Sequence, residues 1–307
     1  MKEIKCSKCG CIVPQESDVC PKCGAPLTDE QKTEAEALYQ VHGDHIGAIM
    51  DAEEFMKKHL PTMIQEGVMH KKAETTCVMG DGVAERTNVF ALLYGKGDIQ
   101  TLALIVYSKR RNTNEFVSVY PYMKGKPHEV VIEKVLEWSN GVEATIKVSL
   151  GDRECAFFAT DYYCNKERYT AGRKAVVELS ALGINVQEGH KGFDFQGQKV
   201  LDFLAKIGEQ PELGEDGRVK PLHFSMEQTV MCISTDEKCP DEAEFQSPVA
   251  EVAYCSVAGV PFVKCGINIA DPDEPCMVPL YFRKDFLPDV SQGQSVSGWL
   301  WLTGQMA

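Results

Sequence analysis

The stretch "EKVLEWSNGVEATIKVSL", residues 133–150, places Asn140-Gly141 between two apolar runs. Asn-Gly between such runs is the strongest short-range signal of a β-hairpin, because both residues tolerate the positive φ angles of a tight type I′ turn. The stretch therefore predicts two antiparallel strands and sets the expectation of a β-rich body.

Further strand and turn signals surround this hairpin. "RTNVFALLYG" (86–95) and "IQTLALIVYSK" (99–109) flank Lys96-Gly97-Asp98, which predicts another hairpin. Gly151-Asp152 then leads into "RECAFFATDYY", and "ERYTAGRKAVVELSALGINV" (167–186) closes a meander of antiparallel strands. "QGQKVLDFLAKIG" (196–208) predicts a helix. The fold class is therefore mainly β with some helix, of the α+β kind.

Two distant segments share an order of residues. "RECAFFATDYY…AGRKAVVELSALG" and "EPCMVPLYFRKDF…QGQSVSGWLWLTG" both run from an acidic residue through Cys and an aromatic strand to Asp, Gly and an apolar strand. Each half resembles part of a small β-barrel of the OB kind. The resemblance implies one or two OB-like barrels, and a fold of this kind does not by itself define a function.

The last predicted strand contains Trp299 and Trp301, which alternate with Leu300 and Leu302. A strand that is apolar on both faces is usually buried on both faces. We therefore expect both tryptophans in the core. The alternative is that one of them is an exposed platform that stacks a nucleic-acid base or contacts a peptide.

The N-terminus carries "CSKCGCIVPQESDVCPKCG", residues 6–24, with five of the thirteen cysteines of the chain. Cys6-x-x-Cys9-Gly and Cys20-x-x-Cys23-Gly are two turns of the kind that each supply two thiolates to a tetrahedral metal ion. No thioredoxin-like βαβ pattern surrounds them, which argues against a redox pair, and a disulfide is the remaining alternative.

The two Cys-x-x-Cys-Gly turns resemble those of the short zinc ribbons found at the N-termini of many bacterial proteins. The resemblance implies one structural zinc ion held by Cys6, Cys9, Cys20 and Cys23. Cys11 departs from the pattern and is expected to be a spare thiol, because four ligands already complete the site. A segment this small would obtain its folding free energy from the metal.

The other cysteines are scattered, several in apolar strand-like contexts, and are expected to pack as small hydrophobic residues. His42 and His45 form His-x-x-His without a third ligand nearby in the sequence. A helix is predicted to begin with a capping box at Thr28–Gln31, its apolar period is interrupted by Gly43 and Gly47, and a second stretch continues helically until Pro61. His45 lies on the apolar stripe, so we expect a packed histidine and no metal ligand.

Net charge limits the partners. The chain has a net charge of −13, and residues 208–251 alone hold eleven carboxylates against Arg218, Lys220 and Lys238. Residues 1–32 balance five lysines with five carboxylates, so the zinc ribbon lacks the basic face typical of nucleic-acid readers. Nucleic-acid binding is therefore not expected.

The longest apolar run, "TLALIVY" at 101–107, is too short to cross a bilayer, and no signal peptide precedes it, so a cytoplasmic location without membrane contact is expected.

The sequence contains no G-x-x-x-x-G-K-[ST], G-x-G-x-x-G or G-x-S-x-G motif. We therefore expect no enzyme but a protein-contact function, as adaptor or regulator, with one zinc ion as cofactor. The alternatives are a binder of single-stranded nucleic acid and an enzyme with an unrecognised site. The expected domains are a zinc ribbon over 1–27, a helical segment over 28–60, an antiparallel β domain over 61–190, and a helix, acid-rich loops and a second OB-like β domain over 191–307.

Overall fold

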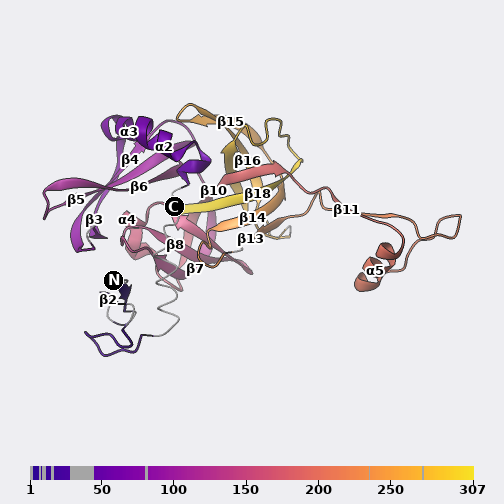
Figure 1. Ribbon diagram of the computed structural model, residues 1–307, viewed down its shortest axis with the longest axis horizontal. Coiled ribbons are helices and arrows are strands. Elements are labelled where there is room, and N and C mark those ends of the chain that lie inside the picture. The colour runs from indigo at the N-terminus through magenta and orange to yellow at the C-terminus, as the bar shows by residue number, and fades with distance from the viewer. Residues whose placement is uncertain are drawn as a thin grey trace.

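The computed structural model describes residues 3–6, 8, 12–14, 17–27, 45–79, 82–234, 236–271 and 273–307 of the chain. Strands make up 52% and helices 13%, which confirms the mainly β fold class. The predicted capping box at Thr28–Gln31 lies outside the described residues. The strands form a ten-stranded sheet, a four-stranded sheet and two two-stranded sheets (Figure 1).

The centre of the molecule is a closed five-stranded barrel with the strand order β7-β8-β9-β18-β10. Its first three strands form an antiparallel meander, and the first two are joined at Asn140-Gly141 as predicted, although the connection spans residues 138–143 and only Gly141 of this pair has a positive φ, of 71°. Strand β18 then pairs parallel with β9 and antiparallel with β10, which returns to β7. The strands are β7 (Lys126–Glu137), β8 (Ala144–Leu150), β9 (Arg153–Ala159), β10 (Lys174–Glu188) and β18 (Ser295–Met306).

A short helical connection, α4 (Tyr162–Asn165) and η3 (Lys166–Arg168), joins β9 to β10. The buried carboxylate of Asp161, just before α4, accepts hydrogen bonds from the Tyr169 hydroxyl at 2.5 Å and the Met306 amide at 3.1 Å. These bonds tie the connection to the end of β18. A buried carboxylate needs such donors because burial without them is costly.

The barrel sheet continues beyond the barrel, because β10 and β18 are long enough to pair with further strands. The other half of β18 pairs with β14, and β10 pairs parallel with β17. The barrel therefore takes strands from both sides of the boundary expected at residue 190. The added strands are β13 (Met231–Ile233), β14 (Glu242–Pro248), β15 (Val252–Val257), β16 (Val260–Asn268) and β17 (Met277–Arg283).

The second sheet is an antiparallel meander in the order β3-β4-β5-β6, and the predicted turn at Lys96–Asp98 joins β4 to β5. A second hydrophobic core lies between this sheet, the helical segment before it and the outer face of the barrel, where Phe158 and Leu182 contribute. The strands are β3 (Val68–Val78), β4 (Ala84–Tyr94), β5 (Ile99–Ser108) and β6 (Thr113–Met123).

The helical segment consists of η1 (Ile46–Ala48) and a fifteen-residue helix made of α2 (Ala52–Glu54), the π-helical turn η2 (Phe55–His59) and α3 (Leu60–Glu66). The sequence predicted that the helix stops at Pro61, but it continues to Glu66. The π turn explains the difference, because the Leu60 amide bonds to the Phe55 carbonyl and Pro61 falls in the first turn of α3, where a missing N–H costs little.

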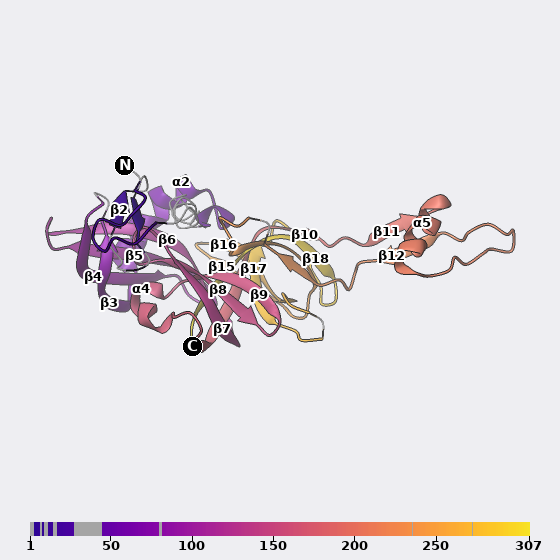
Figure 2. The same ribbon diagram turned by 90° about the horizontal axis from the view of Figure 1, so that it is seen from below.

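A projecting arm extends from the far end of the barrel sheet, between β10 and β13 (Figure 2). It consists of β11 (Gly192–Phe195), α5 (Gln198–Ile207) and β12 (Leu222–Ser225), with β11 and β12 paired antiparallel. The helix predicted at 196–208 is therefore confirmed. The arm and the N-terminal hairpin, β1 (Glu3–Lys5) with β2 (Ile12–Pro14), lie at opposite ends of the molecule (Figure 2).

Candidate metal centre

Three of the four cysteines predicted as ligands lie together. The thiol sulfurs of Cys6, Cys20 and Cys23 are all within 4.8 Å of one another, and Cys6 Sγ is 3.7 Å from Cys23 Sγ. Cys6 and Cys20 are buried and Cys23 is half-buried. Cys9 and Cys11 lie outside the described residues. The arrangement could hold a metal ion.

The second Cys-x-x-Cys turn owes its shape to the backbone. The Gly24 amide donates to the Cys20 carbonyl at 2.8 Å, and the Cys20 amide donates to the Ala25 carbonyl at 2.8 Å. Gly24 has a φ of 68°, which a residue with a side chain rarely adopts. This turn presents the thiols of Cys20 and Cys23 on one side, next to Cys6 at the end of β1.

The chemistry of the cluster fits a metal ion better than a disulfide. The separation of 3.7 Å between Cys6 Sγ and Cys23 Sγ is well beyond the roughly 2.05 Å of a disulfide bond, and all three cysteines are free. Thiolates are soft ligands that select zinc, copper(I) or iron–sulfur centres. Among the described residues of this segment, only Val13 and Leu27 join Cys6 and Cys20 in the buried core, which is small enough to need a metal for stability.

The remaining described cysteines are packed thiols, as predicted. All are free and either buried or half-buried. Burial raises the pKa to about 12 for Cys77, Cys232, Cys265 and Cys276. A raised pKa keeps these thiols protonated and poorly nucleophilic near neutral pH.

One cysteine contact was not visible in the sequence. The Cys276 thiol donates to His128 Nδ1 at 3.5 Å, and His128 Nε2 donates to the Met277 carbonyl at 3.1 Å. Burial raises the pKa of Cys276 and lowers the pKa of His128, so both groups are held neutral. An activated thiol has a lowered pKa, which is the opposite of the shift at Cys276. No sequence signal could have joined residues so far apart in the chain.

His45 is packed, as predicted, but the predicted reason is wrong, because His45 precedes η1 in a left-handed conformation (φ 57°) and does not lie on a helix. Its side chain is 9% exposed, its ring lies 4.3 Å from the Trp301 ring, and its Nε2 is 3.3 Å from a Glu242 carboxylate oxygen. His42 lies outside the described residues. Within the described part of the chain, no further group of three potential ligands gathers besides the N-terminal cysteines.

The two tryptophans of β18 differ, which corrects the expectation that both are core residues. Trp301 is 1% exposed, but Trp299 is 38% exposed. Both point to the same side of β18, and only Trp301 lies under His45 at the start of the helical segment. Trp299 pairs with Asn185 and Glu244 and lacks this cover.

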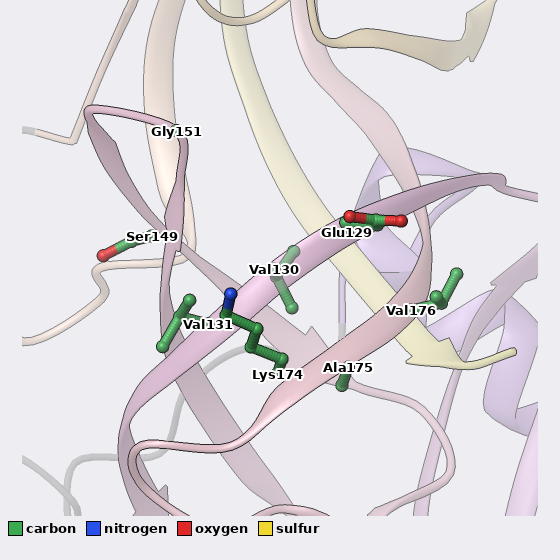
Figure 3. A pocket seen from close by; sticks show the side chains of 8 residues that line it. All are labelled: Glu129, Val130, Val131, Ser149, Gly151, Lys174, Ala175 and Val176. Carbon is green, nitrogen blue, oxygen red and sulfur yellow. The ribbon is translucent and has the colours of Figure 1, made fainter.

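A cavity of about 500 Å³ lies on the outer surface of the barrel, where β7, β8 and β10 meet (Figure 3). Val131 and Val176 form part of its lining, and Glu129, Lys174 and Ser149 supply polar groups. Val176 is 43% exposed. The lining carries one negative charge, on Glu129, and one positive charge, on Lys174, so its charges favour neither an anion nor a cation.

No helix in the described part of the chain is both long and apolar enough to cross a membrane. Comparisons with protein-family models, with curated proteins and with solved structures found no match to this chain.

Proposed function

We propose that the N-terminal segment is a zinc ribbon in which Cys6, Cys9, Cys20 and Cys23 hold one structural zinc ion. The close approach of Cys6, Cys20 and Cys23 supports this assignment. Cys9 is the natural fourth ligand because two Cys-x-x-Cys turns complete a tetrahedron, and a closed site leaves no position for a substrate. A reducing cytoplasm would keep these thiols available for the metal.

The function that we propose is non-catalytic protein–protein contact, and the projecting arm is the observation that carries it. Among its residues between Lys191 and Met226, only Val200 and Leu204 are buried hydrophobic side chains. Phe193 is 50% exposed and Phe224 is 45% exposed. Apolar surface on a segment that projects from the body is characteristic of a binding surface.

One face of the two-stranded β11/β12 sheet is apolar and the other is polar. Phe193 pairs with Phe224, and Phe195 pairs with Leu222, so these four side chains share one face. Helix α5 covers part of that face through Phe203, whose ring lies 4.7 Å from Phe195 and 5.6 Å from Phe224. The other face is polar, with His223 Nδ1 2.8 Å from Asp194 Oδ1. The apolar face is therefore only partly covered.

The partner that fits this surface is an extended segment of another protein. Strands β11 and β12 pair only with each other, so each has a free edge in the described structure. A partner strand can add to such an edge through main-chain hydrogen bonds and place alternate apolar side chains against Phe193 and Phe224. The N-terminal ribbon at the opposite end of the molecule offers a second contact module, as an adaptor requires (Figure 2).

The barrel order, three meandering strands followed by a short helix and two closing strands, is that of OB-like barrels, which often bind single strands. The arm does not favour such a ligand. Three of its five cationic side chains, Lys191, Arg218 and Lys220, lie within ion-pair distance of a carboxylate, and the six carboxylates between residues 191 and 226 give the arm a net charge of −1. Phosphate binding requires cationic groups that are available for the backbone.

The test is selection from a displayed library of random peptides on the immobilised full-length protein. We expect selected peptides with apolar residues at alternate positions. Binding should be lost in Phe193→Ser/Phe224→Ser and retained in Val68→Ser, which removes an apolar side chain that is 72% exposed outside the arm. Circular dichroism confirms that each variant is folded.

A variant without the arm provides the second control. The Met226 amide donates to the Lys191 carbonyl at 3.1 Å, so Asn-Gly can replace residues 192–225 without separating these ends. Peptides that bind this variant as tightly as the full chain would contradict the proposed contact surface. Binding of a single-stranded oligonucleotide with a steep salt dependence would favour the nucleic-acid function instead.

A further inference from the structure

A second cavity, of about 340 Å³, lies where the four-stranded sheet meets the barrel sheet. Its lining comes from β15 with the preceding Glu251, from β16, from Lys124, Gly125 and the first residue of β7, Lys126, from Asp98 in the β4–β5 turn and from Pro279. Small-molecule sites occur preferentially at such junctions and have volumes from about 300 Å³ upward. The cavity is therefore large enough for a small ligand.

An ion pair links the two sheets at this cavity. Lys264 Nζ on β16 lies 2.6 Å from Asp98 Oδ2, and the same ammonium group lies over the Tyr281 ring at 5.7 Å. The pair lowers the pKa of Asp98, with the hydrogen bond from Lys264 as the main cause. The charges of Lys264 and Asp98 thus largely neutralise each other.

Two further lysines, Lys124 and Lys126, line the cavity, and Lys124 is close enough to Asp98 to contribute to the lowering of its pKa. Within the described part of the chain, no carboxylate lies within ion-pair distance of the ammonium group of Lys124 or Lys126. With Lys264, they make three positive charges in the lining against two negative charges from Asp98 and Glu251, a net charge of +1. The whole chain has a net charge of −13, so this is a locally positive place on an acidic protein.

Gly125 holds these two lysines close to the barrel. A Cβ atom at this position would lie 2.8 Å from the backbone of Glu178 and of Leu179, closer than real contacts allow. Only glycine therefore lets the connection run against β10, and the neighbouring residues Lys124 and Lys126 are held beside the cavity by this backbone contact.

The rest of the lining is mainly apolar. Val252, Ala253 and Pro279 contribute, and the half-buried thiol of Cys255 lies near the ion pair, since both Asp98 and Lys264 affect its pKa. Burial is the main cause that raises the pKa of Cys255. An apolar lining with a few polar groups that orient the ligand is the usual composition of a small-molecule site.

We propose that this cavity binds a small organic anion with an apolar body, of the medium-chain carboxylate class. The carboxylate lies against Lys124 and Lys126, and the hydrocarbon covers Val252, Ala253 and Pro279. This site is separate from the arm, so its test does not depend on the protein-contact function.

The test is calorimetric titration of the full-length protein with octanoate, with inorganic phosphate as the probe that lacks an apolar body. We expect saturable binding of octanoate at one site and much weaker binding of phosphate. Lys124→Gln/Lys126→Gln should weaken octanoate binding about tenfold, as expected for the loss of two exposed ion pairs. Lys174→Gln, which changes a lysine of the other cavity, is the matched control and should leave binding unchanged.

Alkylation of cysteines gives an independent readout. Bound octanoate should slow the modification of Cys255, and it should not affect Cys239, another half-buried thiol that does not line the cavity. Peptide mapping by mass spectrometry measures both rates. Equal octanoate affinity in Lys124→Gln/Lys126→Gln and the wild type, or an unchanged rate at Cys255, would overturn the proposal. Phosphate binding as tight as octanoate binding would overturn the role of the apolar lining.

Discussion

The indole nitrogen of Trp301 donates a hydrogen bond of 2.8 Å to the carboxylate of Asp241, and both side chains are buried. This bond joins β18 to the residue that precedes β14, next to the antiparallel pairing of those strands. It explains how a large polar side chain and a carboxylate are accommodated between the barrel and the four-stranded sheet, because buried polar groups are stable only with such partners.

Substitution of the two tryptophans should separate their roles. We expect Trp301→Ala to lower the free energy of unfolding by about 3–5 kcal/mol, because it leaves a cavity and removes the donor to Asp241. Trp299→Ala, at a position 38% exposed, should cost about 1 kcal/mol. Urea unfolding followed by circular dichroism measures both values. Equal losses would show that Trp299 also belongs to the core.

The metal content should be one zinc ion per chain, and elemental analysis of the purified protein measures it. Cys6→Ser combined with Cys23→Ser should abolish zinc binding, because both thiols belong to the cluster. Cys11→Ser is the control and should leave the zinc content unchanged. Loss of zinc in Cys11→Ser alone would mean that the fourth ligand is not Cys9.

Removal of the metal should leave the body folded. Among the described residues, the core of the N-terminal segment contains only residues of that segment, and the two larger cores contain no residue before Ile46. Addition of a chelator, or deletion of residues 1–27, should therefore preserve the main cooperative thermal transition. A truncated protein that loses this transition would show that the ribbon stabilises the body.

Gly298 should be hard to replace. Its φ is +145°, and a Cβ there would lie 1.8 Å from the Asn185 carbonyl oxygen on β10. Gly298→Ala must separate β18 from β10 and should cost about 2 kcal/mol or more. Gly293→Ala is the control, because Gly293 also has a positive φ but open space around it, and it should cost about 1 kcal/mol. Thermal unfolding of both variants compares them.

Alkaline pH should destabilise the protein through its buried thiols. Burial raises the pKa of Cys265 and of Cys276 from 9.0 to about 12. Above pH 9 the unfolded chain loses these protons while the folded chain keeps them, so the stabilisation is complete below pH 9 and is lost as the pH rises toward 12. The urea midpoint, measured in reducing buffer, should fall over this range.

Cys265→Ala supplies the control for this alkaline effect. Its urea midpoint should depend less on pH between 9 and 12 than that of the wild type, whatever its absolute stability. An identical dependence in the two proteins would attribute the alkaline loss to other groups, such as Tyr281, whose pKa is also raised by burial.

Local features of the fold could be predicted from the sequence. The turns at Asn140-Gly141 and Lys96–Asp98 depend on residues that favour particular φ angles, and the helix at α5 depends on a local apolar period. The approach of Cys6, Cys20 and Cys23 follows from the spacing within the cluster. In each case the signal and the structure lie within the same short stretch of chain.

Features that depend on distant contacts could not be predicted. The barrel closes through the parallel pairing of Thr303 with Phe158, which no local pattern indicates. Trp299 is exposed because it lies beyond the part of β18 that the helical segment covers. The arm projects because, in the described structure, β11 and β12 pair only with each other. The binding role proposed for Lys124 and Lys126 could not be predicted, because Asp98 and β15 lie beside them only in the folded chain.

The pairing of β18 with β9 and β10 also constrains how the protein is made on the ribosome. Strands β7 to β10 emerge early, but the strand that closes their barrel is residues 295–306. Until it emerges, β9 and β10 expose edges that can pair with another nascent chain. Slow synthesis between β10 and β18 would prolong this interval, so we expect aggregation during synthesis to increase when elongation through this stretch is slowed.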